Sequence, residues 1–116
     1  MGIIYNQKDR IFHLQANETS YVIQVYGNNH VAHLYWGRKI KSSNLSHMFQ
    51  IIGRGFVPSP DMNDPAFSLD TLPQEYPGFG SSDFRAPAYQ IQLDNGSTIS
   101  DLRYKSHRIF KGKPKL

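Results

Sequence analysis

The chain has 116 residues, of which 39% are hydrophobic and 13% aromatic, and this composition indicates one folded domain rather than a disordered chain. It has no cysteine, which excludes disulfides and thiolate metal sites. No apolar run approaches the about 20 residues that a membrane helix needs, and the N-terminus lacks the features of a secretory signal. We therefore expect a cytoplasmic protein with no membrane partner.

The net charge of +4 is concentrated near the C-terminus. Six basic residues follow Asp101 with no acidic residue among them: Arg103, Lys105, Arg108, Lys111, Lys113 and Lys115. Binding to a phosphate backbone needs such clusters, but only Tyr104 and Phe110 lie among them, fewer aromatics than a base-stacking platform uses. We interpret the segment as the solvated side of a last strand and predict no nucleic-acid partner.

Residues 3–40 have the pattern of short antiparallel strands. The segment 20–26, SYVIQVY, is rich in the β-branched and aromatic residues that favour a pleated surface. Residues 27–29, Gly-Asn-Asn, can adopt the positive φ angles of a hairpin turn, and 31–36 then forms the return strand.

A polar segment from about residue 41 to 87 holds six of the seven prolines. Each proline fixes φ and removes a backbone donor, so we predict a long loop here rather than a helix or a central strand. The segment also contains Phe67, Leu69 and Phe84, which can anchor the loop onto a surface.

The last segment, about 88–111, alternates apolar and polar residues and contains Asn95-Gly96, the strongest hairpin signal in the chain. It predicts a hairpin and a last strand. No segment has the apolar spacing of a helix. The predicted fold class is therefore all-β, an antiparallel β-sandwich with a long Pro-rich loop.

Three carboxylates in the Pro-rich loop are candidates for chemistry: Asp70, Glu75 and Asp83. Paired carboxylates perform glycoside hydrolysis, but the same residue types also cap turns. Sequence spacing in an irregular loop does not fix their separation, so we favour the turn and cap roles.

Arg85 follows Phe84, and the pair could hold a sugar, because a guanidinium binds two oxygens and an aromatic ring covers an apolar sugar face. A structural salt bridge from Arg85 to Asp83 or Glu75 fits the residues equally well. Trp36, at a predicted strand end, could stack on a sugar, although a single Trp more often packs in a core or an interface.

Five histidines raise the question of a metal site: His13, His30, His33, His47 and His107. On a strand, His30 and His33 would point to opposite faces, and no carboxylate lies nearby at ligand spacing. The sequence also has no phosphate-cradling glycine motif and no nucleophile motif. We predict no metal and no cofactor.

A series of short motifs runs through the whole chain: FHL (12–14), HLYWG (33–37), FSLD (67–70), PQEYP (73–77), SDFRAPAYQ (82–90), NGS (95–97), SDLRY (100–104), HRI (107–109) and KGKPKL (111–116). Together they resemble the N-terminal region of family-36 glycoside hydrolases, the microbial α-galactosidases. The half from Phe67 to Leu116 carries the specific part of the resemblance, and residues 41–64 fit it worst.

The resemblance implies that residues 1–116 are the front part of a larger N-terminal β-sandwich domain. The parent would be a retaining hydrolase of terminal α-galactosides of the melibiose and raffinose type. Its catalytic carboxylates would belong to a (β/α)8 barrel that this chain does not contain. The chain alone would then have no catalytic residue, and the three loop carboxylates match no catalytic residue of the family.

The resemblance also implies a homo-tetramer, in which N-terminal loops of one subunit help to wall the active-site pocket of a neighbour. On this basis the candidate contacts to the sugar or to a neighbouring subunit are Asp70, Arg85, Phe67, Phe84 and Trp36. The alternative interpretation is a stand-alone carbohydrate-binding β-sandwich module.

Overall fold

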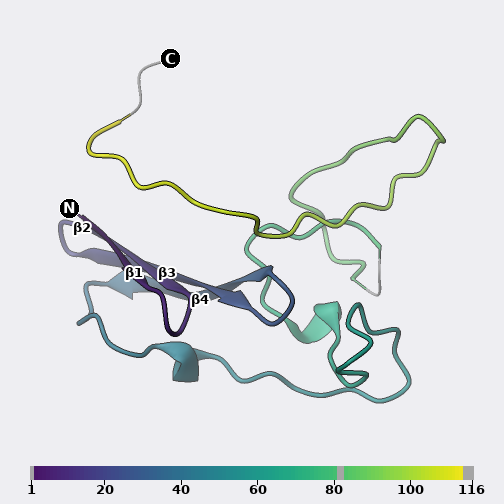
Figure 1. The fold of residues 1–116 in the computed structure, drawn as a ribbon, viewed down its shortest axis with the longest axis horizontal. Helices are drawn as coiled ribbons and strands as arrows, with labels where there is room; N and C mark the ends of the chain where they lie inside the picture. The colour runs from purple at the N-terminus through teal and green to yellow at the C-terminus, as the bar shows by residue number, and fades with distance from the viewer. Residues whose placement is uncertain (1, 81–82, 114–116) are drawn as a thin grey trace.

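The computed structural model describes residues 2–80 and 83–113 and contains one four-stranded sheet (Figure 1). The antiparallel strands follow chain order: β1 (Gly2–Asn6), β2 (Ile11–Ala16), β3 (Thr19–Tyr26) and β4 (His30–Arg38). Two short 3-10 helices follow, η1 (Ser46–Met48) and η2 (Leu69–Thr71). The predicted all-β, antiparallel class is confirmed. The part of the chain that the structure describes holds one layer of the expected sandwich, and none of its helices is long and apolar enough to cross a membrane.

Tight turns join the strands into a meander. Asn17 (φ 50°) lies between β2 and β3, and Gly27 (φ 50°) and Asn29 (φ 67°) lie between β3 and β4. Glycine and asparagine adopt such left-handed angles at low cost, so the turn predicted at residues 27–29 is confirmed. A bulge after Val22 adds Leu34 to β4 as an extra residue, and the Leu34 side chain is buried.

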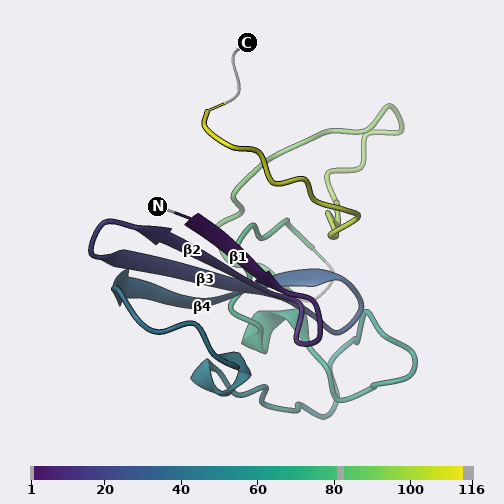
Figure 2. The same ribbon diagram turned by 60° about the vertical axis from the view of Figure 1, so that its left-hand side comes forward.

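The Pro-rich segment covers one face of the sheet up to Leu72, whereas the segment after residue 88 lies on the other side (Figure 2). Two clusters of buried side chains fill the covered face. The first joins strand residues to the start of the loop and consists of Ile11, Val22, Leu34 and Leu45. The second joins β4 to the region around η2 and consists of Ala32, Phe67, Leu69 and Leu72.

The outer edge of β4 is paired with residues 73–75 of the Pro-rich segment. The His33 amide donates to the Pro73 carbonyl at 2.7 Å, and the Glu75 amide donates to the Val31 carbonyl at 2.9 Å. Ala32 and Gln74 face each other in an antiparallel bridge. An open strand edge exposes unpaired donors and acceptors, and this short pairing satisfies part of the β4 edge.

The segment 88–113 departs from the expectation of a hairpin and a last strand. The turn at residues 95–96 forms, with Gly96 at φ 82° and the Leu93 amide 2.9 Å from the Ser97 carbonyl. Within residues 88–113, however, the structure has no strand. An isolated hairpin is marginally stable, and the apolar residues of this one lack a sheet to pack on. Its large apolar side chains are accordingly exposed: Ile91, Leu93, Ile99 and Leu102.

We expect Leu72→Ala to lower the free energy of unfolding by about 2–5 kcal/mol, because Leu72 is fully buried between η2 and β4 and its truncation leaves a cavity. Urea denaturation measures this change. The matched control is Met62→Ala, which truncates an exposed side chain and should change the free energy by less than about 0.5 kcal/mol. Equal effects of the two substitutions would mean that the second cluster is not a packed core.

Candidate functional site

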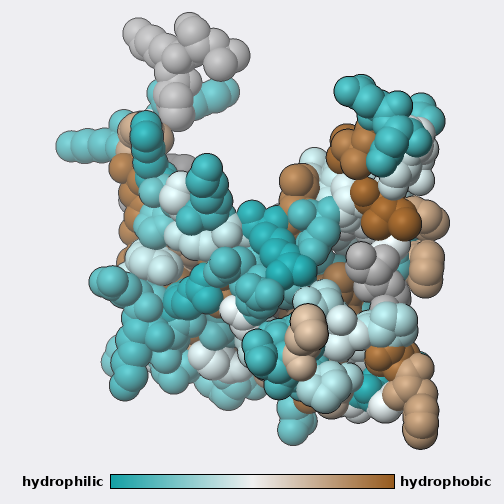
Figure 3. All heavy atoms as spheres, turned by 45° about the vertical axis from the view of Figure 1, so that its right-hand side comes forward, coloured by the Kyte–Doolittle hydropathy of each residue, from teal (hydrophilic) through white to brown (hydrophobic). Residues whose placement is uncertain are grey.

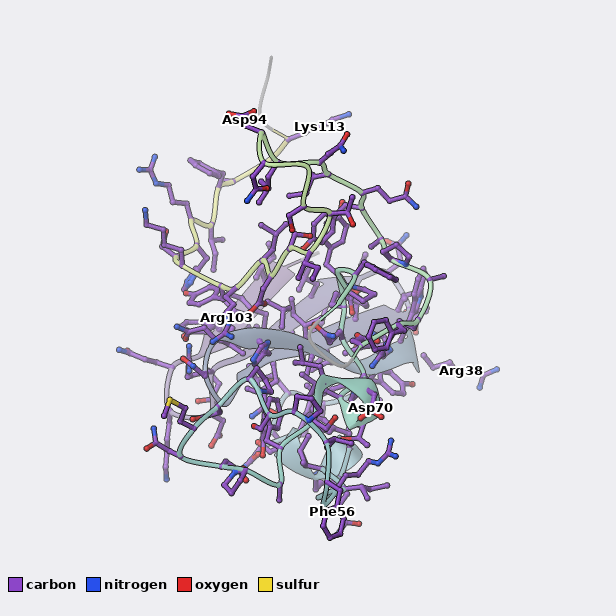
Figure 4. All side chains as sticks on the ribbon, turned by 90° about the vertical axis from the view of Figure 1, so that its right-hand side faces the viewer. Arg38, Phe56, Asp70, Asp94, Arg103 and Lys113 are labelled. Carbon is purple, nitrogen blue, oxygen red and sulfur yellow. The ribbon has the colours of Figure 1, made fainter. Side chains whose placement is uncertain are left out.

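The η2 turn presents Asp70 at the surface, and Figure 4 shows its side chain beside the η2 ribbon. Leu69 is buried and anchors the turn, while the Asp70 side chain remains 30% exposed. The Asp70 carboxylate accepts hydrogen bonds from the Ser68 hydroxyl and from the Arg54 guanidinium. Its two oxygens are therefore held in one orientation.

Arg85 lies behind the same turn. Its Nη2 donates to the carbonyl of Leu69 at 2.6 Å and to the carbonyl of Leu72 at 2.9 Å. Its Nε donates to Asp83 Oδ1 at 2.7 Å, and Asp83 is buried. Of the two salt bridges that the sequence left open for Arg85, the structure therefore contains the one to Asp83.

Glu75 forms a second polar cluster, on the opposite face of the sheet from the buried clusters. His33 Nδ1 lies 2.9 Å from Glu75 Oε2, and the Tyr21 hydroxyl donates to Glu75 Oε1. Partial burial raises the pKa of the Glu75 carboxyl. Trp36 is 75% exposed, and its ring packs edge-on against Tyr21 with 5.8 Å between the ring centroids.

The five predicted contact residues thus fall into different environments. Asp70 lies on η2, and Arg85 binds a carbonyl of the same turn. Phe84 precedes Arg85 and has an exposed ring, which packs edge-on against Phe79 with 5.6 Å between the ring centroids. Phe67 is buried in the second core cluster. Trp36 belongs to the Glu75 cluster. Sequence reasoning missed Tyr21 and His33 as partners of Glu75, because no local pattern reveals which strand a loop residue reaches.

Beyond these clusters, an apolar groove of about 920 Å³ lies between the sheet and the C-terminal segment. Its lining includes Ile3, Leu14 and Tyr21 from the sheet and Ile109 and Phe110 from the C-terminal segment. Figure 3 shows that this C-terminal segment and the 88–98 loop rise as separate arms with a hollow between them. Within residues 2–80 and 83–113, no three His, Asp or Glu side chains gather into a metal-binding set.

Two buried histidines have incompletely satisfied rings. His13 Nε2 lies 2.8 Å from the Ser20 hydroxyl, while His13 Nδ1 and His30 Nε2 have no hydrogen-bond partner among the described residues. Burial lowers the pKa of both histidines. The charge of Arg103 lowers the pKa of His30 further, and the nearby acids, Asp101 and Asp61, oppose this shift.

Comparison with known proteins gives a consistent set of relatives. The glycosyl hydrolase family 36 N-terminal domain matches residues 29–116. The chain is 53% identical to alpha-galactosidase AgaA of Geobacillus stearothermophilus over 116 aligned residues. The alignment covers 100% of this chain and 16% of AgaA.

Solved structures agree with this result. The crystal structure of alpha-galactosidase AgaB from Geobacillus stearothermophilus matches with a TM-score of 0.86 and 52% identity, covering 100% of this chain and 16% of that one. A variant of AgaA in complex with raffinose matches with a TM-score of 0.80 and 55% identity, covering 91% of this chain and 15% of that one. The chain therefore spans about a sixth of the length of these relatives.

We expect the free energy of unfolding to fall as the pH is lowered through and below about 6.5, the ordinary histidine pKa. Since burial lowers the pKa of His13 and His30, the unfolded chain binds protons in this range that the folded chain does not. Glu75 acts in the opposite direction nearer its usual range, because its pKa is raised on folding.

Urea titrations between pH 7 and pH 5 measure this slope. His30→Gln and His13→Gln should each flatten it, whereas His47→Gln, at an exposed position, should leave it unchanged. A slope that is the same in all three variants and the parent chain would refute the assignment to the buried histidines.

Proposed function

This chain belongs to the N-terminal domain family of the family 36 glycosyl hydrolases, and from this membership we propose that it is the non-catalytic N-terminal part of an α-galactosidase that hydrolyses terminal α-galactosides of the melibiose and raffinose type. The 53% identity to AgaA supports the activity, and the raffinose complex of an AgaA variant supports the substrate class. The catalytic carboxylates would lie outside this chain, in the barrel that the family resemblance implies. A cytoplasmic location and a tetrameric parent stay predictions.

Within that enzyme, we assign the Pro-rich segment to subunit contact and to the wall of the substrate pocket. One observation carries this assignment: the segment exposes large apolar side chains although it is tied to a packed core. Phe56 is fully exposed at the tip of the segment, as Figure 4 shows, and Met62 and Phe84 are also exposed. Exposed apolar side chains that lie together, as the rings of Phe79 and Phe84 do, are typical of surfaces that contact another molecule.

The predicted contact residues differ in exposure, so we assign them different roles in this surface. Asp70 and Phe84 are accessible, so they can bind a sugar hydroxyl, a sugar face or a neighbouring subunit. Phe67 is buried and supports the wall from behind. An aromatic ring and an oriented carboxylate are the groups that sugar-binding surfaces combine, because one covers the apolar C–H face and the other accepts from hydroxyls.

In the full-length enzyme that contains this domain, Asp70→Asn and Phe84→Ser should each raise KM for raffinose or reduce the fraction of tetramer. We expect an effect of about 5-fold or more, the size typical of an important interface residue, with kcat nearly unchanged because the catalytic groups lie elsewhere. Steady-state kinetics and light scattering measure the two quantities. Asp94→Asn, an exposed acid in the 88–98 loop, is the control. Unchanged kinetics and assembly in both variants would overturn the assignment.

A stand-alone sugar-binding module is the second candidate, and the exposure of Trp36 favours it, since exposed indole rings often stack on sugars. Trp36 is the one tryptophan of the chain, so its fluorescence reports on this site alone. Under the main proposal, titration of the purified chain with raffinose leaves the fluorescence unchanged. A saturable change with raffinose, absent with the β-galactoside lactose, would support the module instead.

A further inference from the structure

The η2 turn is short, and hydrogen bonds from outside the turn reinforce it. The Leu72 amide donates to Leu69 O at 3.2 Å, and the Gln74 amide donates to Leu72 O at 2.8 Å. A carbonyl oxygen can accept two hydrogen bonds, and the Arg85 Nη2 group supplies the second one to Leu69 O and to Leu72 O. One guanidinium therefore links the carbonyl at the start of η2 to the carbonyl just after its end.

Arg85 is itself fixed from the side of the sheet. Its Nε contacts the buried Asp83, and the other Asp83 oxygen accepts from Gln74 Nε2 at 2.5 Å. Gln74 is paired with β4 through the bridge to Ala32. The main-chain bonds of Pro73 and Glu75 therefore hold Gln74 at the β4 edge, and the hydrogen bonds of two side chains, Gln74 and Asp83, extend from there to the guanidinium of Arg85.

On its outer side, η2 holds the protruding loop at residues 52–66. Arg54 pairs with Asp70, and the Thr71 hydroxyl donates to the Ile52 carbonyl at 3.1 Å. The Arg54 amide also donates to the Ala66 carbonyl at 2.9 Å, which closes the base of the loop. The exposed Phe56 lies within this loop.

We propose that Arg85 is a positioning residue, which acts through the η2 turn to fix Asp70 and the 52–66 loop and does not itself contact sugar or a neighbouring subunit. The inference rests on the proposed function for its effect on substrate or assembly. The geometry favours this role because three of the Arg85 side-chain hydrogen bonds go to residues within the domain, all three of which are buried. A lysine cannot replace it, because an ammonium group lacks the planar fork that reaches a carboxylate and two carbonyls together.

The test uses the full-length enzyme with Arg85→Ala and Arg85→Lys. Hydrogen exchange should become faster in residues 52–72 and stay unchanged in β1 to β3, and KM for raffinose should rise about tenfold with kcat within about twofold. Combining Arg85→Ala with Asp70→Asn should add little to the change in KM, since both act through the same carboxylate. If Arg85→Ala does not fold, Arg85→Lys gives the same readouts, because it keeps the charge and loses the fork.

Arg103→Ala is the matched control. Arg103 also pairs with an aspartate two residues before it, Asp101 at 2.7 Å, and donates to one carbonyl, that of Asn28, so neither of these partners belongs to η2. This variant should leave exchange in residues 52–72 and KM unchanged.

Two outcomes separate the possible failures. A higher KM with unchanged exchange in residues 52–72, or fully additive effects of Arg85→Ala and Asp70→Asn, would mean that Arg85 contacts the ligand directly and would overturn the positioning role. Faster exchange with no change of KM or assembly in Arg85→Ala, Asp70→Asn or Phe84→Ser would support the positioning role and overturn the proposed function of the surface.

Discussion

The outer edge of β4 pairs with residues 73–75, and most of the arrangement of the Pro-rich segment follows from this contact. A proline-rich chain cannot form its own ladder, so it satisfies main-chain groups by using an edge that already exists. The same three residues place Gln74 against the buried Asp83 and Glu75 against Tyr21 and His33. This short pairing therefore positions two polar contacts, that of Gln74 with Asp83 and that of Glu75 with Tyr21 and His33.

The strands and turns of the first part of the chain were predictable because their signals are local. Alternating β-branched and aromatic residues favour a strand wherever they occur, and residues such as Asn29 and Gly27 supply turn angles without help from distant groups. Burial was less predictable. His13 is almost completely buried, and its polar partner Ser20 lies diagonally opposite it on the adjacent strand β3, a relation that becomes visible only when the register is known.

The segment 88–113 and the η2 site contain features that local sequence signals could not predict. The 95–96 turn forms because it depends on local residues, Gly96 with its positive φ and Asn95, whose side chain accepts from the Ser97 amide. A ladder also needs a neighbouring strand, which no local pattern specifies. Likewise, the Asp83–Arg85 pair joins residues two positions apart and was among the predicted alternatives. The bonds from Arg85 to the carbonyls of Leu69 and Leu72 cross the fold, and no sequence pattern indicates a main-chain acceptor.

A loop without regular structure can still form a precise surface when its ends and its turn are fixed to a packed sheet. Ordering a flexible loop and its long side chains at the moment of binding costs free energy, and this cost reduces affinity. Here the turn that carries Asp70 is already fixed by Arg85 on one side and by the buried Leu69 on the other. Under the proposed function, the carboxylate would meet its ligand already oriented, and the domain would contribute to affinity through rigidity as well as through contact.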